Sequence, residues 1–237
     1  MIVTSAPTSA GQAAFFTPKI LAGLGVAGLI AWLIPFDQGV ETLTGGQPAP
    51  RCALLLAAAL AGLFLTRRVG LHVEPQNLKR PVLTPVAVGL AVAIGCTLAD
   101  RLLSGGASEG YVRDMAHAPL VTRWLYYIMR AFDENILYRL FLASGLAWLF
   151  SRLRGTAEPR PTTGAFAAAF VVAQLVNIWI NASSLHALTP IALVHDAVRY
   201  VAPALVWSWL FWKHGFQSNE IACTTVHVWL QPLAGLP

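Results

Sequence analysis

Charged side chains are scarce in this sequence. Only 11% of its 237 residues are Asp, Glu, Lys or Arg, whereas a soluble domain carries about 25%. With 56% hydrophobic residues and so few charges, the chain cannot cover a water-exposed surface of the usual polarity. This shortage excludes an ordinary soluble domain and predicts that lipid covers much of the surface.

Cysteine is also rare, and Cys52, Cys96 and Cys223 stand singly. Because no Cys-x-x-Cys pair exists, the sequence indicates neither a disulfide framework nor a cysteine zinc site. A His-Glu-x-x-His segment is missing as well, so we expect no metal and no cofactor. The net charge of +5 forms no basic stripe with interleaved aromatics, and we therefore expect no nucleic-acid partner.

Long apolar runs take the place of charge. Each membrane-spanning helix needs roughly 20 apolar residues, so the chain has room for about six to eight transmembrane helices. We predict an all-α fold, a polytopic integral membrane helical bundle in which residues 1–237 form a single membrane domain. The expected helical runs are residues 20–36, 52–66, 82–99, 116–132, 134–150, 166–180, 190–212 and 221–236.

Basic residues are concentrated in the segments 67–80 and 152–160 and around Lys213. Cytoplasmic loops of membrane proteins carry an excess of Lys and Arg, so we expect these segments to face the cytoplasm. The run 116–132 differs from the others because it mixes Arg123 and Arg130 with aromatic residues. That mixture is typical of a helix at the membrane interface or one that faces protein.

An acid, an amide and an arginine interrupt the run that begins at residue 134: Glu134, Asn135 and Arg139. Ionisable side chains at bilayer depth cost roughly 2.5–3.5 kcal/mol each on insertion scales, and they are usually functional. Asn135 and Arg139 are four residues apart, as are Arg130 and Glu134, so each pair shares a helix face. Glu134 is a candidate general base that activates water. The alternative is an ion-paired helix start.

Three amides, Gln174, Asn177 and Asn181, follow at helical spacing in an otherwise apolar run. Amides inside a membrane need hydrogen-bond partners or a water-filled cavity. They therefore predict either a polar site wall that binds a carbonyl or stabilises an oxyanion, or hydrogen bonding between helices.

Two further runs carry histidine. His195 is a candidate base or ligand, or a buried packing residue. Cys223, His227 and Gln231 are spaced by four and share one face of the last run. A Cys–His pair suggests a nucleophile, but the sequence shows no third, orienting acid.

These segments together resemble the CAAX-protease and bacteriocin-processing family of intramembrane proteases. The family shows, in order, Glu-Glu-x-x-x-Arg, Phe-x-x-x-His, and a final His followed four residues later by Asn or Asp. The resemblance covers roughly residues 124–232, with the first motif at 134–139, the second at 170–174, and an aromatic-basic-glycine turn at 208–215. Glu134 and Arg139 match. The departures from the family pattern are Asn135, Gln174, Cys223 and His227.

The resemblance implies a membrane endopeptidase in which glutamate and histidine activate water and other polar groups steady the oxyanion. The expected catalytic residues are Glu134, Arg139 and His227. The expected site-lining residues are Asn135, Gln174, Asn177, His195 and Cys223. Either His227 or His195 would supply the imidazole.

The expected partners are the lipid bilayer and a membrane-associated peptide or protein substrate, and the expected location is the bacterial inner (plasma) membrane. The alternative is a catalytically degenerate family member that binds a membrane partner as an immunity or scaffold protein. A small-solute transporter would need an inverted repeat, and the sequence shows none.

Overall fold

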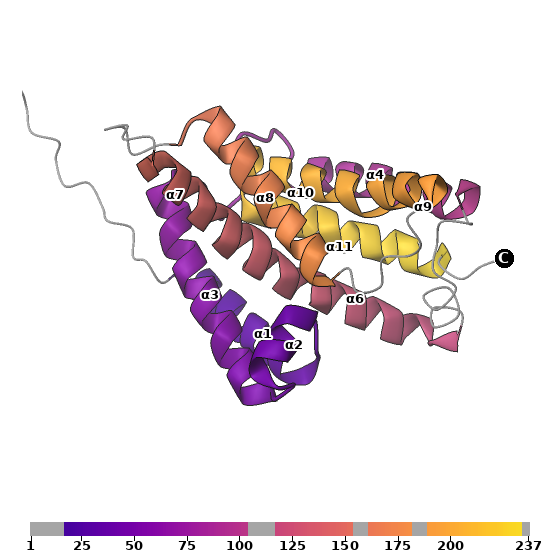
Figure 1. Cartoon of the computed structure of the whole chain (residues 1–237), viewed down its shortest axis with the longest axis horizontal. Coiled ribbons are helices and arrows are strands. Elements are labelled where there is room, and N and C mark those ends of the chain that lie inside the picture. The colour runs from indigo at the N-terminus through magenta and orange to yellow at the C-terminus, as the bar shows by residue number, and fades with distance from the viewer. Residues whose placement is uncertain (1–16, 104–116, 154–160, 182–188, 234–237) are drawn as a thin grey trace, which may run out of the picture.

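The structure of the chain is a computed structural model that describes residues 17–103, 117–153, 161–181 and 189–233 (Figure 1). Within these residues every regular element is a helix, so the all-α prediction is confirmed for the part of the chain described. The helices pack side by side as a bundle, with the N-terminal ones on one flank and the C-terminal ones on the other (Figure 1).

The N-terminal flank contains a sharp elbow. Helix α1 (Pro18–Leu33) is followed by the short α2 (Gln38–Thr44), and the two axes differ by 76°. Asp37 begins α2 because its side chain accepts a hydrogen bond from the backbone N–H of Val40 at 2.9 Å. Helix α3 (Pro48–Arg68) then runs back along α1.

A long continuous helix crosses the middle of the bundle (Figure 1). It consists of α6 (Leu120–Glu134), the π-helix η2 (Asn135–Ala143) and α7 (Ser144–Leu153). The runs 116–132 and 134–150, expected as separate helices, are thus joined in one 34-residue helix from Leu120 to Leu153. The reason is local, because no glycine or proline lies between residues 120 and 143 to interrupt the backbone.

The remaining helices pack around this long helix. They are α4 (Leu83–Leu102), α8 (Thr163–Asn181), α9 (Pro190–Asp196), the π-helix η4 (Ala197–Val201), α10 (Ala202–His214) and α11 (Phe216–Leu233). Helix α11 contacts α4, α6 and α10, whereas η2 contacts α3 and α8.

Glycine allows two of these helix pairs to approach closely. A Cβ atom on Gly62 of α3 would lie 2.8 Å from the carbonyl oxygen of Leu140 in η2, and one on Gly89 of α4 would lie 2.4 Å from that of Ala222 in α11. Both distances are shorter than van der Waals contact. Small residues at helix crossings are typical of membrane bundles, where close backbone packing replaces the hydrophobic effect.

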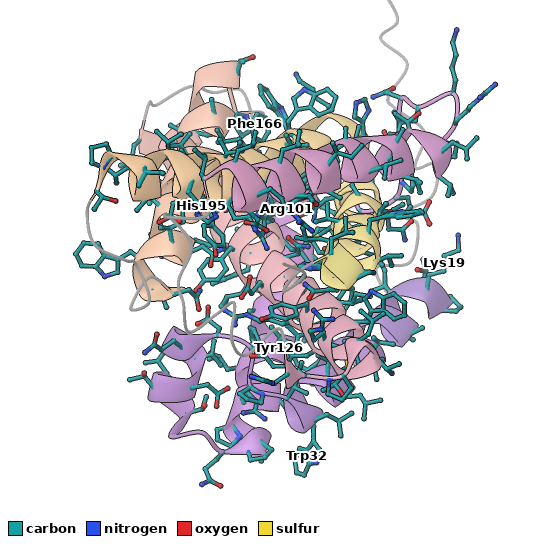
Figure 2. The ribbon with its side chains drawn as sticks, turned by 90° about the vertical axis from the view of Figure 1, so that its right-hand side faces the viewer. Lys19, Trp32, Arg101, Tyr126, Phe166 and His195 are labelled. Carbon is teal, nitrogen blue, oxygen red and sulfur yellow. The ribbon has the colours of Figure 1, made fainter. Side chains whose placement is uncertain are left out.

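Within the described ranges, four helices are long and apolar enough to cross a membrane: Pro48–Arg68, Leu83–Leu102, Leu120–Leu153 and Thr163–Asn181. The bent pair α1–α2 is a fifth candidate. Large apolar side chains point outward from the bundle, among them Trp32 at the far end of α1 from Lys19 (Figure 2), which is 53% exposed, and Trp179, which is 85% exposed. Among the described residues the structure therefore supports four or five spans of an integral membrane protein in contact with lipid. The larger number of six to eight stays a prediction.

Candidate functional site

A cavity of about 360 Å³ lies where α6, η2, α8, η4, α10 and α11 meet. Its volume is at the lower end of the range typical of ligand pockets. Seven of the eight residues expected at the site line it: Glu134, Asn135, Arg139, Gln174, Asn177, Cys223 and His227. The long helix, α8 and α11 therefore bring together polar residues that are far apart in the sequence.

Glu134 is the last residue of α6, and its carboxylate is held by an ion pair. Nε of Arg130, one turn earlier, lies 2.7 Å from Oε1 of Glu134. The Glu134 side chain is 21% exposed and lines the cavity, so the ion pair does not seal the carboxylate into the protein interior. The helical pairing of these two residues predicted from the sequence is confirmed.

Arg139 joins the π-helix to α8. Its Nη1 donates to Oδ1 of Asn135, and its Nη2 donates to Oε1 of Gln174 at 3.3 Å. All three side chains are buried, so the guanidinium charge is held by neutral amide oxygens on two sides. Gln174 therefore accepts a hydrogen bond from Arg139 that links α8 to η2.

The π-helix begins directly after Glu134, at Asn135. A π-helix bonds each N–H five residues back instead of four, which widens the backbone, and such segments often occur at functional sites. Here the widened segment contains both Asn135 and Arg139 and places them against the cavity. Sequence reasoning, which used α-helical spacing, did not predict it.

The amide row on α8 ends in a network that sequence reasoning missed. Asn181 donates from Nδ2 to Oδ2 of Asp37 at 2.8 Å and to Oδ1 of Asn177 at 2.8 Å. Tyr138 of η2 also donates from its hydroxyl to Oδ2 of Asp37. Nη2 of Arg130 lies 3.5 Å from Oδ1 of Asn181, so the network reaches the ion pair of Glu134.

Asp37 is the centre of this network and is 2% exposed. In the sequence it marks only the end of an apolar run, and its two side-chain partners lie 101 and 144 residues away. The one local signal is an acidic residue placed before a short helix, which indicates a cap but no distant partner.

The face of α11 that carries Cys223, His227 and Gln231 lines the cavity, as the spacing of four predicted. The His227 ring stacks on Tyr127 of α6, with centroids 5.9 Å apart and planes inclined by 19°. Nδ1 of His227 and both polar atoms of the Gln231 side chain are buried without a hydrogen-bond partner in the described structure.

His195 is the expected site residue that does not line the cavity. It lies inside the bundle (Figure 2) and is 2% exposed. Its Nε2 is 3.1 Å from Oδ1 of Asp100, and its Nδ1 is 3.0 Å from Oδ1 of Asp196. Both ring nitrogens therefore face carboxylates, which matches the alternative reading of His195 as a packing residue.

The described lining of the cavity includes the carboxylates of Glu134 and Asp196, the imidazole of His227, several amides and the buried guanidinium of Arg139. Within the described ranges no three His, Cys, Asp or Glu side chains gather in a group that would hold a metal ion.

No family model, no curated protein and no solved structure matches the chain. The family resemblance consequently rests on the motifs of the sequence alone.

Proposed function

We propose that this protein is a divergent intramembrane endopeptidase of the CAAX type, within the CAAX-protease and bacteriocin-processing family. The observation that carries the proposal is the meeting of Glu134 and His227 at one cavity. They come from different helices, and together they supply the carboxylate and the imidazole that peptide hydrolysis by activated water requires.

In this proposal Glu134 takes a proton from a water molecule as the water oxygen attacks the carbonyl carbon of a peptide bond. The donors of Asn135, Arg139 and Gln174 stabilise the negative charge that develops on the carbonyl oxygen. The C–N bond then breaks, and the leaving amine takes a proton from one ring nitrogen of His227 while the proton that Glu134 took from water passes to the other ring nitrogen. Asn177 and Cys223 shape the wall beside the attacked bond.

The substrate class and the membrane location in this proposal are those predicted from the sequence. The substrate is a peptide or protein held at the membrane, because the cavity lies among helices of membrane-spanning length. The protein crosses the bacterial inner membrane six to eight times, including helices beyond the four or five that meet the length and composition criteria.

The decisive experiment is cleavage by the purified, detergent-solubilised protein. A prenylated CAAX-type peptide and a panel of membrane-segment peptides serve as substrates, and products are identified by mass spectrometry. Glu134→Gln keeps the size of the side chain but removes the base, and we expect it to abolish cleavage. Glu74→Gln changes an exposed glutamate and is the matched control. Equal cleavage by wild type and Glu134→Gln would refute the assigned role.

The alternative function is a membrane binding or scaffold protein. It is favoured by the ion pair of Glu134 with Arg130 at 2.7 Å and by the hydrogen bond that already occupies Gln174, since both reduce the groups free for proton transfer. Saturable binding of a substrate-panel peptide, with no product after prolonged incubation and equal binding by Glu134→Gln, would favour this alternative.

A further inference from the structure

One buried side chain that lines the cavity has no use in the mechanism proposed above. Gln231 of α11 is 1% exposed, and neither its amide oxygen nor its amide nitrogen has a hydrogen-bond partner in the part of the chain described. A buried amide without a partner carries a free-energy cost, so such groups in folded proteins usually serve a ligand or a bound water.

The two unpartnered atoms of the Gln231 side chain determine which kind of ligand would fit beside it. A carboxamide offers one acceptor and two donors in one plane. An anion such as a carboxylate or a phosphate would satisfy the nitrogen and leave the oxygen unpaired. An extended polypeptide satisfies both, because a residue in a strand presents its N–H and its C=O to the same side.

The face of α11 provides room for such a segment. Cys223 and Gln231 are two helical steps of four apart, which is about 12 Å at 1.5 Å per residue. An extended chain covers about 3.3–3.6 Å per residue, so three to four residues span this distance. His227 lies between them, with an unpartnered Nδ1 and a ring held against Tyr127.

We propose that Gln231 is a substrate-binding residue that pairs with one peptide group of an extended polypeptide segment lying along the Cys223–His227–Gln231 face of α11. The inference rests on the proposed function for the identity of that polypeptide, the substrate. It adds a binding role for a residue outside the family motifs. The pairing also meets a requirement of the membrane interior, where backbone N–H and C=O groups must find partners.

The test measures binding separately from cleavage. The probe is a fluorescein-labelled, end-blocked hexapeptide of alternating Ala and Leu, with a set of analogues in which one amide at a time is replaced by an ester. An ester keeps the carbonyl but lacks the N–H that would donate to Gln231. Binding is followed by fluorescence anisotropy on the full-length protein carrying Glu134→Gln, so that the probe stays intact.

Gln231→Leu removes both polar atoms at nearly constant volume, and we expect it to weaken binding of the amide peptide about tenfold, as loss of about 1.4 kcal/mol does. In the protein with Gln231, one ester position should weaken binding by a similar factor. In Gln231→Leu that ester should make no difference, because its partner is already gone. Gln217→Leu changes a glutamine of the same helix that does not line the cavity, and it should bind normally.

Three results would overturn the inference: no saturable binding of any probe, equal binding of amide and ester peptides at every position, or full binding by Gln231→Leu. If Gln231→Leu fails to fold, Gln231→Asn retracts the amide by one methylene and should weaken binding in the same way. The outcomes separate the two proposals. Ester-sensitive binding without cleavage by wild type would refute hydrolysis and leave the role of Gln231 intact. Glu134-dependent cleavage with full binding by Gln231→Leu would support hydrolysis and refute the role of Gln231.

Discussion

At the scale of single residues, Arg139 connects two neutral amide side chains of the site. A buried cation needs partners that satisfy its donors. In the family register that we propose, Asn135 takes the place of a second glutamate and Gln174 takes the place of a histidine. The side-chain amide oxygens of both residues accept hydrogen bonds from the same guanidinium. The two substitutions are therefore linked through one side chain and need not be read as independent losses.

If the proposed function is correct, adding imidazole groups to the site is expected to increase hydrolysis. The double substitution Gln174→His and Cys223→His places histidine at both family positions beside the cavity. General acid–base catalysis contributes about 10²–10⁴-fold, so we expect kcat/KM on a cleaved peptide to rise at least about tenfold. The same double variant with Glu134→Gln is the control and should be inactive. Unchanged cleavage in the double variant would argue against the family register at these two positions.

Asp37 is expected to stabilise the protein through its carboxylate. Asp37→Asn replaces one carboxylate oxygen by a donor that meets the donors of Tyr138 and Asn181. Hydrogen bonds to charged groups contribute about 1.5–3 kcal/mol, and we expect the free energy of unfolding to fall by about that amount. Unfolding in detergent followed by circular dichroism measures it. Glu74→Gln, at an exposed carboxylate, should leave stability unchanged.

Some residues of the site could be predicted from the sequence and others could not. Glu134, Asn135 and Arg139 were predicted because they interrupt an apolar run within about one and a half helical turns. Asp37 was not predicted, because its hydrogen-bond partners become its neighbours only after α8 and η2 have packed against the elbow. His195 was a candidate base or ligand; of its two carboxylate neighbours, Asp196 is the next residue in the sequence, whereas Asp100 is brought to it by the packing of α9 against the end of α4.

At the scale of elements, the packing of α4 on α11 positions the face that carries Cys223, His227 and Gln231. The backbones meet at Gly89, beside Ala222. One added methyl group at Gly89 would push α11 away from α4 and shift that face relative to the long helix.

A matched pair of glycine substitutions tests this contact. Gly89→Ala would place its Cβ 2.4 Å from the carbonyl oxygen of Ala222, and we expect a loss of about 1–3 kcal/mol in the free energy of unfolding. Gly95→Ala lies on the same helix with no atom within 4 Å of the added Cβ. It should leave stability unchanged or raise it by up to about 1 kcal/mol, because alanine favours the helix. Equal effects of the two substitutions would contradict the close approach.

The elements themselves follow from the sequence in different degrees. Apolar length predicted α3, α4 and α8 because lipid-facing helices need little else. The continuity of the long helix was missed, since the charges at residues 133–134 suggested a boundary although no residue there breaks a helix. The π-helix was missed as well, because its bonding pattern depends on tertiary contacts of η2 with α3 and α8.

At the scale of the whole molecule, basic residues gather at one end of the bundle. Arg67 and Arg68 end α3, and Lys213 lies in the last turn of α10. The backbone N–H of Phe216 donates to the carbonyl of His72 at 3.0 Å, which joins the segments that follow these two helices. The sequence predicted that each basic segment faces the cytoplasm, and the fold places these two together.

The orientation is testable by labelling introduced cysteines in intact bacterial cells. Glu74 lies at the basic end, where it pairs with Lys19, whereas Thr42 lies on α2 beyond the far end of α1, a helix about 24 Å long at 1.5 Å per residue. We expect Glu74→Cys to react with a membrane-impermeant maleimide only after permeabilisation, and Thr42→Cys to react in intact cells. The opposite pattern would invert the orientation.

The elbow between α1 and α2 has a consequence for the order of assembly during synthesis. Asp37 leaves the ribosome 144 residues before Asn181, the partner that secures it to α8. At about 5–20 residues per second, the nascent chain carries this acidic corner without that partner for about 7–30 s. The elbow can therefore take its final position only after α8 has been made, and a chain truncated before Asn181 would lack the hydrogen bond that holds Asp37 to α8.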